Sequence, residues 1–368
     1  IVLASPDPSG VDVFAADIGT VCDRFVGWPE PGPSRLRRIR ALFDSIPVAA
    51  ATDRSPAGRR TIAALLAEKP DVALVDFPHA AVLLPDRIET ASTIFTHNVE
   101  AEIFARHAEV AQGPMQLVWR DQARKMRRFE GDTLRRFDSA IAVSARDARA
   151  LTALYDLRRV EVIDTGVDLD FYAFQPPESA ADPGPGGGSL VFTGAMDWRA
   201  NIDGIEFLME EVWPLVLRAR PKAEATIVGR NPPADLVARA QQRGFAWRFT
   251  GFVDDVRPFV AASNVYVIPL RVGSGTRIKA FEAMAMGRPV VSTAVGVEGL
   301  DVGHEAHYFA ADSAADFAAA ILRLLGDSAL RDRLARAARA RVEERFSWAH
   351  VARQFEAICQ MALELHRA

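Results

Sequence analysis

The sequence is poor in cysteine, with Cys22 and Cys359 as the two cysteines among 368 residues. Two cysteines this far apart form neither a disulfide framework nor the clustered spacing of a structural metal site, so they favour a reducing compartment. No apolar run approaches the ~20 residues that a membrane-spanning helix needs. No segment has the pattern of a signal peptide. We therefore expect a cytoplasmic protein.

The sequence also lacks a large excess of charge of either sign. Its 44 Lys and Arg residues against 48 Asp and Glu residues give a formal net charge of −4. A nearly balanced charge argues against non-specific binding to nucleic acid as the main role. We therefore expect no nucleic-acid partner. The length is sufficient for about two domains of ordinary size.

Strand and helix signals alternate along the whole chain, which is the pattern of parallel sheets covered by helices. The sequence therefore predicts an α/β protein with two doubly wound domains. Ligands of such sheets bind at the carboxyl ends of the strands. The predicted strands are 2–4, 72–75, 92–95, 140–143, 160–163, 190–193, 224–228, 247–250, 264–268, 289–292 and 307–309.

The predicted domain boundaries follow from composition. Residues 1–167 form the first domain and residues 190–346 the second. Between them, residues 168–189 are rich in Pro, Gly and acidic residues and are predicted to be a linker. A last helix, residues 347–368, follows Ser347 as its N-cap.

The segment RVGSGTRIKAFEAMAMGRPVVS, residues 271–292, is the most informative part of the chain. A glycine-rich loop runs into a helix that carries Arg277, Lys279 and Glu282 in its first two turns. The free N–H groups and positive dipole end of such a helix attract phosphate. Two cations beside it and a carboxylate for sugar hydroxyls indicate a site for a nucleoside diphosphate.

A plainer interpretation of the same residues also stands. Glycine at a helix start is often turn chemistry alone, and Lys279 with Glu282 would form a solvated i,i+3 pair. Composition does not decide between the two interpretations.

The sequence FEAMAMGRPVV at residues 281–291 favours the first interpretation. It resembles the donor-binding helix of the retaining, nucleotide-sugar-dependent glycosyltransferases of family four, which reads close to (L/F)EAMA(x)G(x)PVV. The resemblance implies the GT-B fold, in which two Rossmann-like domains face a cleft and the C-terminal helix crosses back to the first domain. It also implies a donor sugar linked to UDP or GDP.

The resemblance assigns roles within this segment. Arg277, Lys279 and the amides of Gly275 and Thr276 would hold the diphosphate, and Glu282 would bind the ribose. The family usually has a further glutamate eight positions before the ribose-binding one, and this chain has Ser274 there. Ser274 or backbone N–H groups would then contact the donor hexose.

Other candidate positions follow from the same resemblance. His97, in FTHNVEAE, would lie near the reacting sugar or the acceptor hydroxyl, although a lone histidine is most often structural. Gly194 and Arg199, in TGAMDWRANIDG, follow the first strand of the second domain and would face the diphosphate. Glu298 is a weaker candidate for a ribose or sugar contact, with an exposed loop acid as the alternative.

Several polar residues near these candidates are predicted to have structural roles. We expect Asn201 to cap a helix over 203–219, and Glu100 to cap the helix that follows His97. Asp168 is predicted to make a turn, so we expect no metal site and no cofactor. The segment TGFVDDVRPF at residues 250–259 resembles the family's loop that presents backbone groups to the nucleobase, and the glycines at residues 186–188 are predicted to belong to the linker.

Two basic amphipathic stretches, residues 34–43 and 118–137, interleave arginine with apolar side chains. The ordinary interpretation is a solvated face over a packed one. The sharper hypothesis is peripheral docking at the anionic inner face of the cytoplasmic membrane, which would suit a lipid-linked acceptor.

The start of the chain differs from the family pattern. Family-four enzymes usually open with a strand and a glycine-rich loop, whereas this sequence begins IVLASPD. We expect that the native N-terminus is absent from the sequence, with PDPSG at residues 6–10 as a degenerate loop in the alternative.

The predicted function is transfer of a hexosyl group from a nucleoside-diphosphate sugar to a saccharide or lipid-linked acceptor, in bacterial polysaccharide or glycoconjugate synthesis. Retention of configuration is implied by the resemblance alone. A non-catalytic nucleotide-sugar-binding protein or inactive partner subunit is the alternative, which Ser274 favours. A nucleotide-sugar 2-epimerase would need an array of acids and histidines that the sequence does not show.

Overall fold

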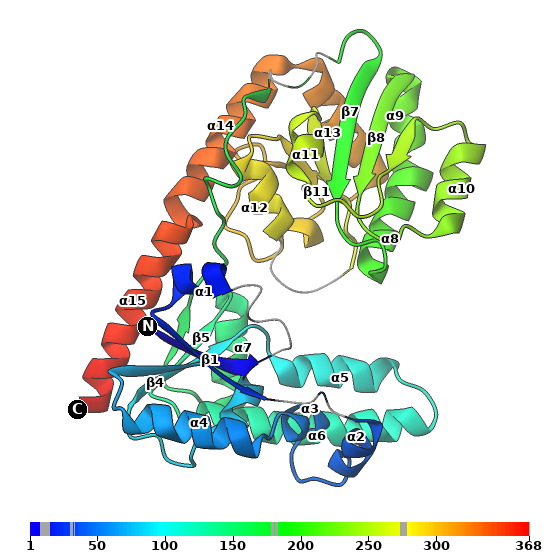
Figure 1. Ribbon diagram of the computed structural model, residues 1–368. Helices are drawn as coiled ribbons and strands as arrows, with labels where there is room; N and C mark the ends of the chain where they lie inside the picture. Colours follow the sequence, from blue (N-terminus) through cyan, green and yellow to red (C-terminus); the bar gives the residue numbers. More distant parts are fainter. Residues whose placement is uncertain are drawn as a thin grey trace. The chain divides into compact units, whose positions relative to one another are not determined.

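The computed structural model describes residues 1–7, 15–29, 32, 34–177, 180, 183–272 and 278–367. The chain divides into two compact units, which are described separately (Figure 1). The first unit contains Ile1–Ile163 and Gln354–Ala368, and the second contains Asp164–Arg353. Each unit has a parallel sheet with helices, so the predicted α/β class is confirmed.

The first unit has a four-stranded parallel sheet and a separate parallel pair of strands. The predicted strands in this unit are confirmed, but the strand Arg24–Pro29 was missed. Its sequence, RFVGWP, contains Gly and ends in Pro, and Trp28 alone is buried, so it has no alternating pattern to detect. The sheet has the order β3 (Val72–Asp76), β4 (Ala91–Thr96), β5 (Ser139–Ala142) and β6 (Val160–Val162), and the pair is β1 (Val2–Asp7) with β2 (Arg24–Pro29).

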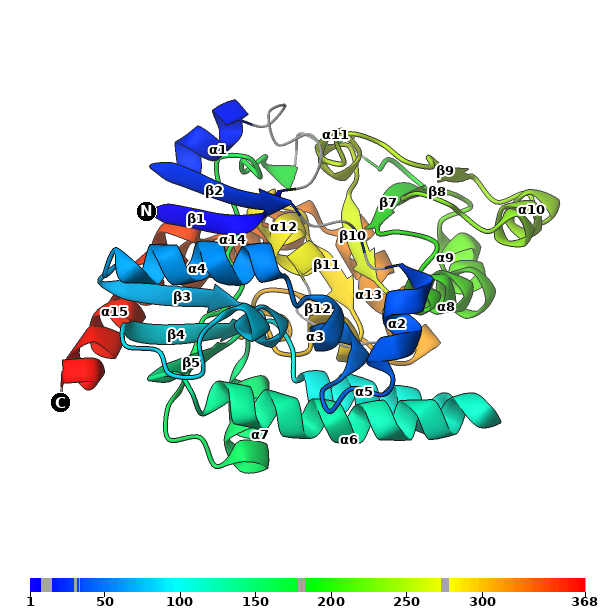
Figure 2. The same ribbon diagram turned by 60° about the horizontal axis from the view of Figure 1, so that its bottom comes forward.

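The sequence predicts helices in the first unit at about 34–44, 57–68, 100–109, 115–136 and 145–155, and the structure has a helix at each of these positions. Three short helices, at 15–21, 48–52 and 78–83, were not predicted. Serine side chains cap three of them, because the hydroxyls of Ser34, Ser55 and Ser144 accept from N–H groups in the first turn. Helices α5 and α6 lie side by side (Figure 2). The helices are α1 (Ala15–Val21), α2 (Arg35–Ala41), α3 (Val48–Thr52), α4 (Pro56–Ala67), η2 (Pro78–Leu83), α5 (Glu100–Val110), α6 (Pro114–Leu134) and α7 (Ala145–Tyr155).

The second unit has a six-stranded sheet in which every pairing is parallel. Its strand order places the earliest strand, β7, near the centre, as in a doubly wound fold. The order is β12 (Phe309–Ala310), β11 (Val290–Ser292), β10 (Val265–Ile268), β7 (Gly187–Thr193), β8 (Lys222–Val228) and β9 (Trp247–Phe249).

The predicted linker, residues 168–189, extends too far toward the C-terminus, because β7 already begins at Gly187. Gly187, Gly188 and Ser189 are strand residues that pair with the start of β8. A Cβ atom on Gly188 would lie 2.6 Å from the methyl carbons of Leu325. Glycine is therefore required at this position by close packing of a helix on the strand, and its low strand propensity misled the prediction.

The sequence predicts helices in the second unit at about 203–219, 233–243, 254–262, 277–286, 314–325 and 328–345, and the structure has helices at these positions. The first begins earlier than predicted, at Arg199, and the short helix Val295–Val297 was not predicted. The predicted helix 203–219 is split by a turn of π-helix at Leu208–Val212. Pro214 follows this turn, and a proline cannot donate to the carbonyl four residues earlier and would clash with it. The helices are α8 (Arg199–Phe207), η4 (Leu208–Val212), α9 (Trp213–Ala219), α10 (Ala234–Gln242), α11 (Arg257–Ala261), α12 (Ile278–Ala285), η5 (Val295–Val297), α13 (Ala314–Gly326) and α14 (Ser328–Arg345).

The last helix, α15 (Trp348–Arg367), begins in the second unit, and its residues from Gln354 onward belong to the first. Near its end, His366 Nε2 lies 3.0 Å from the carbonyl oxygen of Glu89. Across the part of the chain that the structure describes, no helix combines the length and apolar composition needed to cross a bilayer.

Candidate active site

A pocket opens in the second unit where β7 and β8 end (strands labelled in Figure 1). Its volume is about 420 Å³. Its position agrees with the rule that open parallel sheets bind ligands at the carboxyl ends of their strands. The described lining consists of Tyr172, Thr193, Gly194, Ala195, Val228, Gly229, Arg230, Phe252, Val253, Val256, Lys279 and Glu282.

Two glycines keep the strand ends of this pocket free of side chains. A Cβ atom on Gly229 would lie 1.8 Å from the carbonyl oxygen of Gly194. A Cβ atom on Gly194 would lie 2.9 Å from Lys279 Nζ. The structure thus places the predicted residue Gly194 in the pocket and explains why no larger residue fits there.

Lys279, the predicted diphosphate ligand, lies on the first turn of α12 and lines the pocket. Its Nζ donates to Asn201 Oδ1 at 3.2 Å and lies 4.5 Å from the ring centroid of Phe192. A cation above an aromatic face and beside an amide oxygen is held in place on two sides. The ammonium group is therefore fixed within the pocket.

Asn201 does not cap a helix, so that prediction was wrong. Helix α8 begins at Arg199 with Trp198 as its N-cap, which leaves Asn201 inside the first turn. Its side chain is buried, and its Nδ2 donates to the carbonyl oxygen of Ala195 at 2.8 Å. Asn201 instead connects the end of β7 to Lys279.

Glu282, the predicted ribose ligand, lies on α12 three residues after Lys279 and also lines the pocket. Its Oε1 accepts a hydrogen bond from the hydroxyl of Tyr172 at 2.7 Å. Burial raises the pKa of Glu282 above its usual value, and the Tyr172 hydrogen bond and the Lys279 charge oppose that rise. Burial and the neighbouring carboxylate raise the pKa of Tyr172 in turn.

Of the other residues predicted to bind the sugar donor, two are described by the structure but lie outside the lining of the pocket, and four are not described. Arg199 is exposed at the start of α8, and Glu298 is exposed at the end of η5. Neither belongs to the described lining of the pocket. The other predicted residues, Ser274, Gly275, Thr276 and Arg277, lie outside the described residues.

The loop predicted to face the nucleobase does contribute to the pocket. Phe252, Val253 and Val256 line it, and Phe252 is 74% exposed. An exposed aromatic ring at a pocket offers a flat apolar surface.

Sequence reasoning missed two further lining residues, Arg230 and Tyr172. Arg230 pairs with Asp197 at 3.1 Å. For Tyr172, an aromatic residue shortly after Gly166-Val167-Asp168 was a usable signal.

Asp168 makes the predicted turn. Its Oδ1 accepts from the N–H groups of Asp170 and Phe171 at 3.0 and 2.9 Å. Within the described ranges, no group of three or more His, Cys, Asp or Glu side chains is arranged to hold a metal ion.

His97 lies in the first unit, directly after β4. Its Nε2 lies 2.6 Å from Asp76 Oδ1 at the end of β3. Its ring stacks on Phe77, with a centroid distance of 4.1 Å and an interplanar angle of 23°. Phe77 has a φ of 67°, which is rare for a bulky residue and is found where surrounding structure imposes it. Asp76 and Phe77 therefore hold the imidazole in one orientation.

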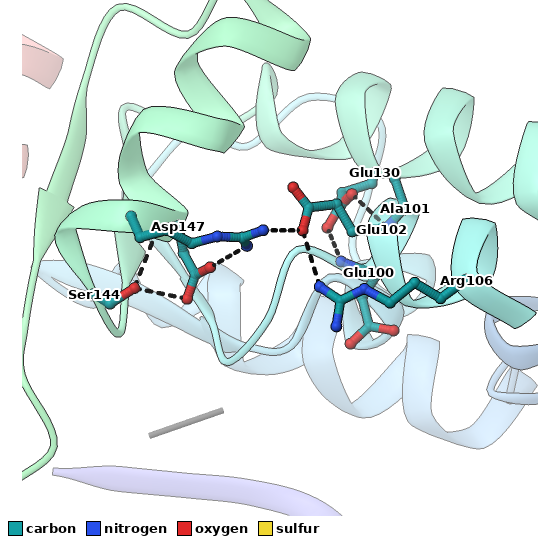
Figure 3. A network of polar contacts seen from close by, with 8 residues as sticks. Glu100, Ala101, Glu102, Arg106, Glu130, Ser144 and Asp147 are labelled. Carbon is teal, nitrogen blue, oxygen red and sulfur yellow. Dashed lines mark hydrogen bonds and ion pairs between the residues drawn. The ribbon is translucent and has the colours of Figure 1, made fainter. Parts of the chain in front are cut away.

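Glu100 does not cap helix α5, so this prediction was also wrong (Figure 3). The cap is Glu130 of α6, which accepts from the N–H groups of Glu100 and Ala101 at 2.8 and 3.1 Å. Glu130 is fully buried and also accepts from the hydroxyl of Tyr155. Glu100 is left as a second buried carboxyl whose pKa is raised by burial, 4.0 Å from His79 Nε2.

Comparison with known families identifies the chain. A family model described as Glycosyltransferase Family 4 matches residues 11–171, and one described as Glycosyl transferases group 1 matches residues 187–327. Together the two matches cover more than half of the 368 residues. The chain belongs to the family-four glycosyltransferases. The resemblance inferred from FEAMAMGRPVV is confirmed.

Curated members of this family are similar to parts of the chain. Glycogen synthase of Mycobacterium tuberculosis is 28% identical over 284 residues, which are 74% of this chain and 64% of that protein. Phosphatidyl-myo-inositol mannosyltransferase of Mycobacterium leprae is 31% identical over 196 residues, 52% of this chain and 51% of that protein. The chain thus spans less than two thirds of the length of these relatives.

Solved structures of family-four-like proteins share the fold. HepE of Anabaena, in complex with UDP and glucose, has a TM-score of 0.63 at 16% identity and covers 98% of this chain and 99% of its own. Sucrose-phosphate synthase from Thermosynechococcus elongatus has a TM-score of 0.60 at 21% identity, covering 83% and 77%. The GT-B fold with two Rossmann-like domains is confirmed.

Proposed function

We propose that this family-four glycosyltransferase transfers a hexosyl group from a UDP- or GDP-linked sugar to a hydroxyl of a saccharide or lipid-linked acceptor. The transfer would retain configuration and serve bacterial polysaccharide or glycoconjugate synthesis in the cytoplasm. The observation that carries the proposal is the single pocket lined by both Lys279 and Glu282. The ammonium group of Lys279 would neutralise charge on the diphosphate, and the carboxylate of Glu282 would accept hydrogen bonds from the ribose hydroxyls.

Lys279 would stabilise the leaving diphosphate. Negative charge develops on the diphosphate as the glycosidic bond breaks, and a cation already fixed at that position stabilises the transition state without reorganisation. Asn201 and Phe192 provide that fixation. In this proposal Arg277 and the amides of Gly275 and Thr276, which precede α12 in the sequence, share the charge.

The acceptor side of the proposal depends on His97. A carboxylate that accepts a hydrogen bond from one imidazole nitrogen sets the tautomer and leaves the other nitrogen available. Asp76 Oδ1 lies 2.6 Å from His97 Nε2 and would accept this hydrogen bond. His97 Nδ1 would then contact the reacting sugar or the acceptor hydroxyl.

The relatives support the proposal by their own activities. By their names, one relative synthesises the polysaccharide glycogen and the other is a mannosyltransferase that acts on phosphatidyl-myo-inositol. HepE was solved with UDP and glucose. In this proposal the chain uses the same class of donor, and the charges come from its own side chains without a metal cofactor.

The proposal predicts that a nucleoside diphosphate stabilises the folded protein. A ligand that binds only the folded state raises the melting temperature, by an amount that grows with the ratio of ligand concentration to Kd. We expect an increase with UDP or GDP, and smaller increases with UMP or GMP, which lack the second phosphate. Melting curves with UDP, GDP, ADP and the two monophosphates measure this. No increase with any nucleotide would reject the proposed function.

A non-catalytic nucleotide-sugar-binding protein is the second candidate. Ser274 favours it, because the family usually has a glutamate at this position. Both candidates predict the same melting curves, but a binding protein leaves the sugar attached. Release of UDP or GDP from the matching sugar nucleotide, measured over hours with and without saccharide acceptors, decides between them.

We further propose that the first unit docks on anionic membranes through α6. Arg127 and Arg128 are exposed, and no ion pair is found for either among the described residues. Together with Arg124 and Arg135 they line a hollow of about 330 Å³ between α6 and α7, whose lining also includes Asp132. Arg124 and Arg135 are paired with Asp121 and Asp132. A concave surface with four guanidinium groups suits phosphate head groups.

If α6 docks on anionic membranes, removing its exposed arginines should weaken vesicle binding. Each basic residue near an anionic surface contributes about 1 kcal/mol, so R127A/R128A should weaken binding to phosphatidylserine vesicles by at least about tenfold. Vesicle sedimentation measures this, with phosphatidylcholine vesicles as the neutral comparison. The matched control is R59A/R60A, a pair of exposed neighbouring arginines on α4. Equal binding to both kinds of vesicle would exclude docking.

A further inference from the structure

The Glu282 carboxylate is held by a residue from a distant part of the chain. Tyr172 is 110 residues away, in the segment before β7, yet its hydroxyl donates to Glu282 Oε1 at 2.7 Å. Among the described residues, Tyr172 is the one hydrogen-bond donor to the Glu282 carboxylate. Both side chains line the same pocket, so their contact is part of the site surface.

Tyr172 itself is fixed from several directions. Its N–H donates to the carbonyl oxygen of Asp168 at 2.9 Å, and its own carbonyl oxygen accepts from Arg339 of α14 at 3.1 Å. Its ring meets the ring of Phe171 edge to face, with centroids 5.0 Å apart. Because both the N–H group and the carbonyl oxygen of Tyr172 are hydrogen-bonded, its backbone is fixed. Its phenol hydroxyl is therefore a preorganised donor to Glu282.

The neighbouring Phe171 ties this segment to the loop that lines the pocket. The guanidinium carbon of Arg257 lies 3.7 Å from the ring centroid of Phe171, and its Nη1 donates to the Phe171 carbonyl oxygen at 3.0 Å. Arg257 is in turn paired with Asp255, at 2.8 Å. The position of Tyr172 is therefore set by the same loop that contributes Phe252 to the pocket.

We propose that Tyr172 is a positioning residue for the nucleotide: it holds one oxygen of Glu282 so that the other accepts from the ribose hydroxyls. The inference rests on the proposed function, because it takes Glu282 as the ribose ligand. A carboxylate has two oxygens, and an unrestrained one rotates about its last bond. Tyr172 removes this freedom before the nucleotide binds, which lowers the cost of ordering the site.

The Tyr172 hydrogen bond also favours the ionised form of Glu282, which is the better acceptor for the ribose hydroxyls. Burial alone raises the pKa of this carboxyl, and the phenol hydrogen bond and the charge of Lys279 lower it. Among the described residues, the other charged or titratable groups nearby include Tyr266, whose hydroxyl contacts Thr193, and Arg230 in the pocket lining. Asp255 and Arg257 act on Tyr172, and Arg339 donates to its carbonyl oxygen. Losing the phenol hydroxyl should therefore move the acid limb of nucleotide binding to higher pH.

The test compares a nucleotide with and without its ribose hydroxyls. Calorimetry first finds which of UDP, GDP and ADP binds the wild-type protein most tightly, and then uses that nucleotide and its 2′,3′-dideoxy form. Y172F keeps the ring and removes the hydroxyl. We expect it to lose about tenfold in affinity for the ribonucleotide, because hydrogen bonds to charged groups are among the strong ones. Affinity for the dideoxynucleotide should change less than twofold.

Two further variants complete the cycle. In an E282Q background, Y172F should have no additional effect on ribonucleotide affinity, since the group that it positions is already changed. Y308F, which removes a phenol hydroxyl elsewhere in the same unit, should leave both affinities unchanged.

The outcomes separate the two hypotheses. Equal losses for both nucleotides in Y172F, or no loss for either, would overturn the positioning role while the proposed function stands. An acid limb that stays at the same pH in Y172F would also overturn it. No binding of any of the three nucleotides by the wild-type protein would reject the proposed function and this inference together.

Discussion

Replacing Lys279 with alanine is expected to slow sugar transfer by about 10²–10³-fold, the usual cost of removing one group that stabilises developing charge. The substitution removes the ammonium group that Asn201 and Phe192 hold in the pocket. Because that charge matters most when the diphosphate leaves, the loss should lie mainly in kcat rather than in KM. Steady-state release of UDP or GDP from the donor sugar measures both constants.

A matched control distinguishes local chemistry from a general effect of charge. Lys222, at the start of β8, is exposed and outside the lining of the pocket. K222A removes the same charge from the same unit and should leave kcat within twofold of the wild-type value, as is usual for exposed surface sites. Normal turnover by K279A and by R277A would show that the diphosphate is bound elsewhere.

Replacing Glu130 with alanine should cause the largest loss of stability, about 3 kcal/mol or more in the free energy of unfolding. The carboxylate is fully buried and accepts from the N–H groups of Glu100 and Ala101 (Figure 3). It also accepts from the hydroxyl of Tyr155. Alanine leaves these donors without an acceptor in an interior that water does not reach. Urea unfolding followed by circular dichroism gives the free energies.

Two variants show whether the buried hydrogen bonds are the cause. E130Q keeps one acceptor oxygen and the side-chain volume, so its loss should be smaller than that of E130A. E109A changes an exposed glutamate on α5 and should alter stability by less than about 0.5 kcal/mol. Similar stabilities for E130A and E109A would contradict the capping role of Glu130.

The sequence predicted elements whose cause is local. Runs such as Ser92–Phe95 and 264–268 combine β-branched and aromatic residues, and both are strands in the structure. The strand Arg24–Pro29 has no such run and forms by pairing with β1 along its whole length. Its only buried side chain is Trp28, so neither composition nor periodicity identified it.

Predictions failed where the partner is distant in sequence. A cap was assigned to Asn201 and to Glu100 because these residue types stand near helix starts. Their roles are set by Lys279, 78 residues away from Asn201, and by Glu130, 30 residues away from Glu100. No pattern within a window of one helix carries this information.

In the candidate site, too, residues that are close in the sequence were predicted and those that are distant were not. Lys279 and Glu282 were found because one helix carries both, so their spacing fixes their relation. Tyr172 joins them through the fold alone, because its partner Glu282 is 110 residues away in the sequence. The loop from Gly273 to Arg277 precedes these residues in the sequence, and its predicted roles stay predictions.

The contact between Gly194 and Gly229 has a consequence for how such enzymes diversify. Since a side chain at either position would clash, this part of the pocket lining presents peptide groups. Peptide groups present the same donors and acceptors whatever the sequence, so substitution cannot retune this part of the lining. New donor preferences would arise at lining positions that carry side chains, such as Arg230 and Phe252.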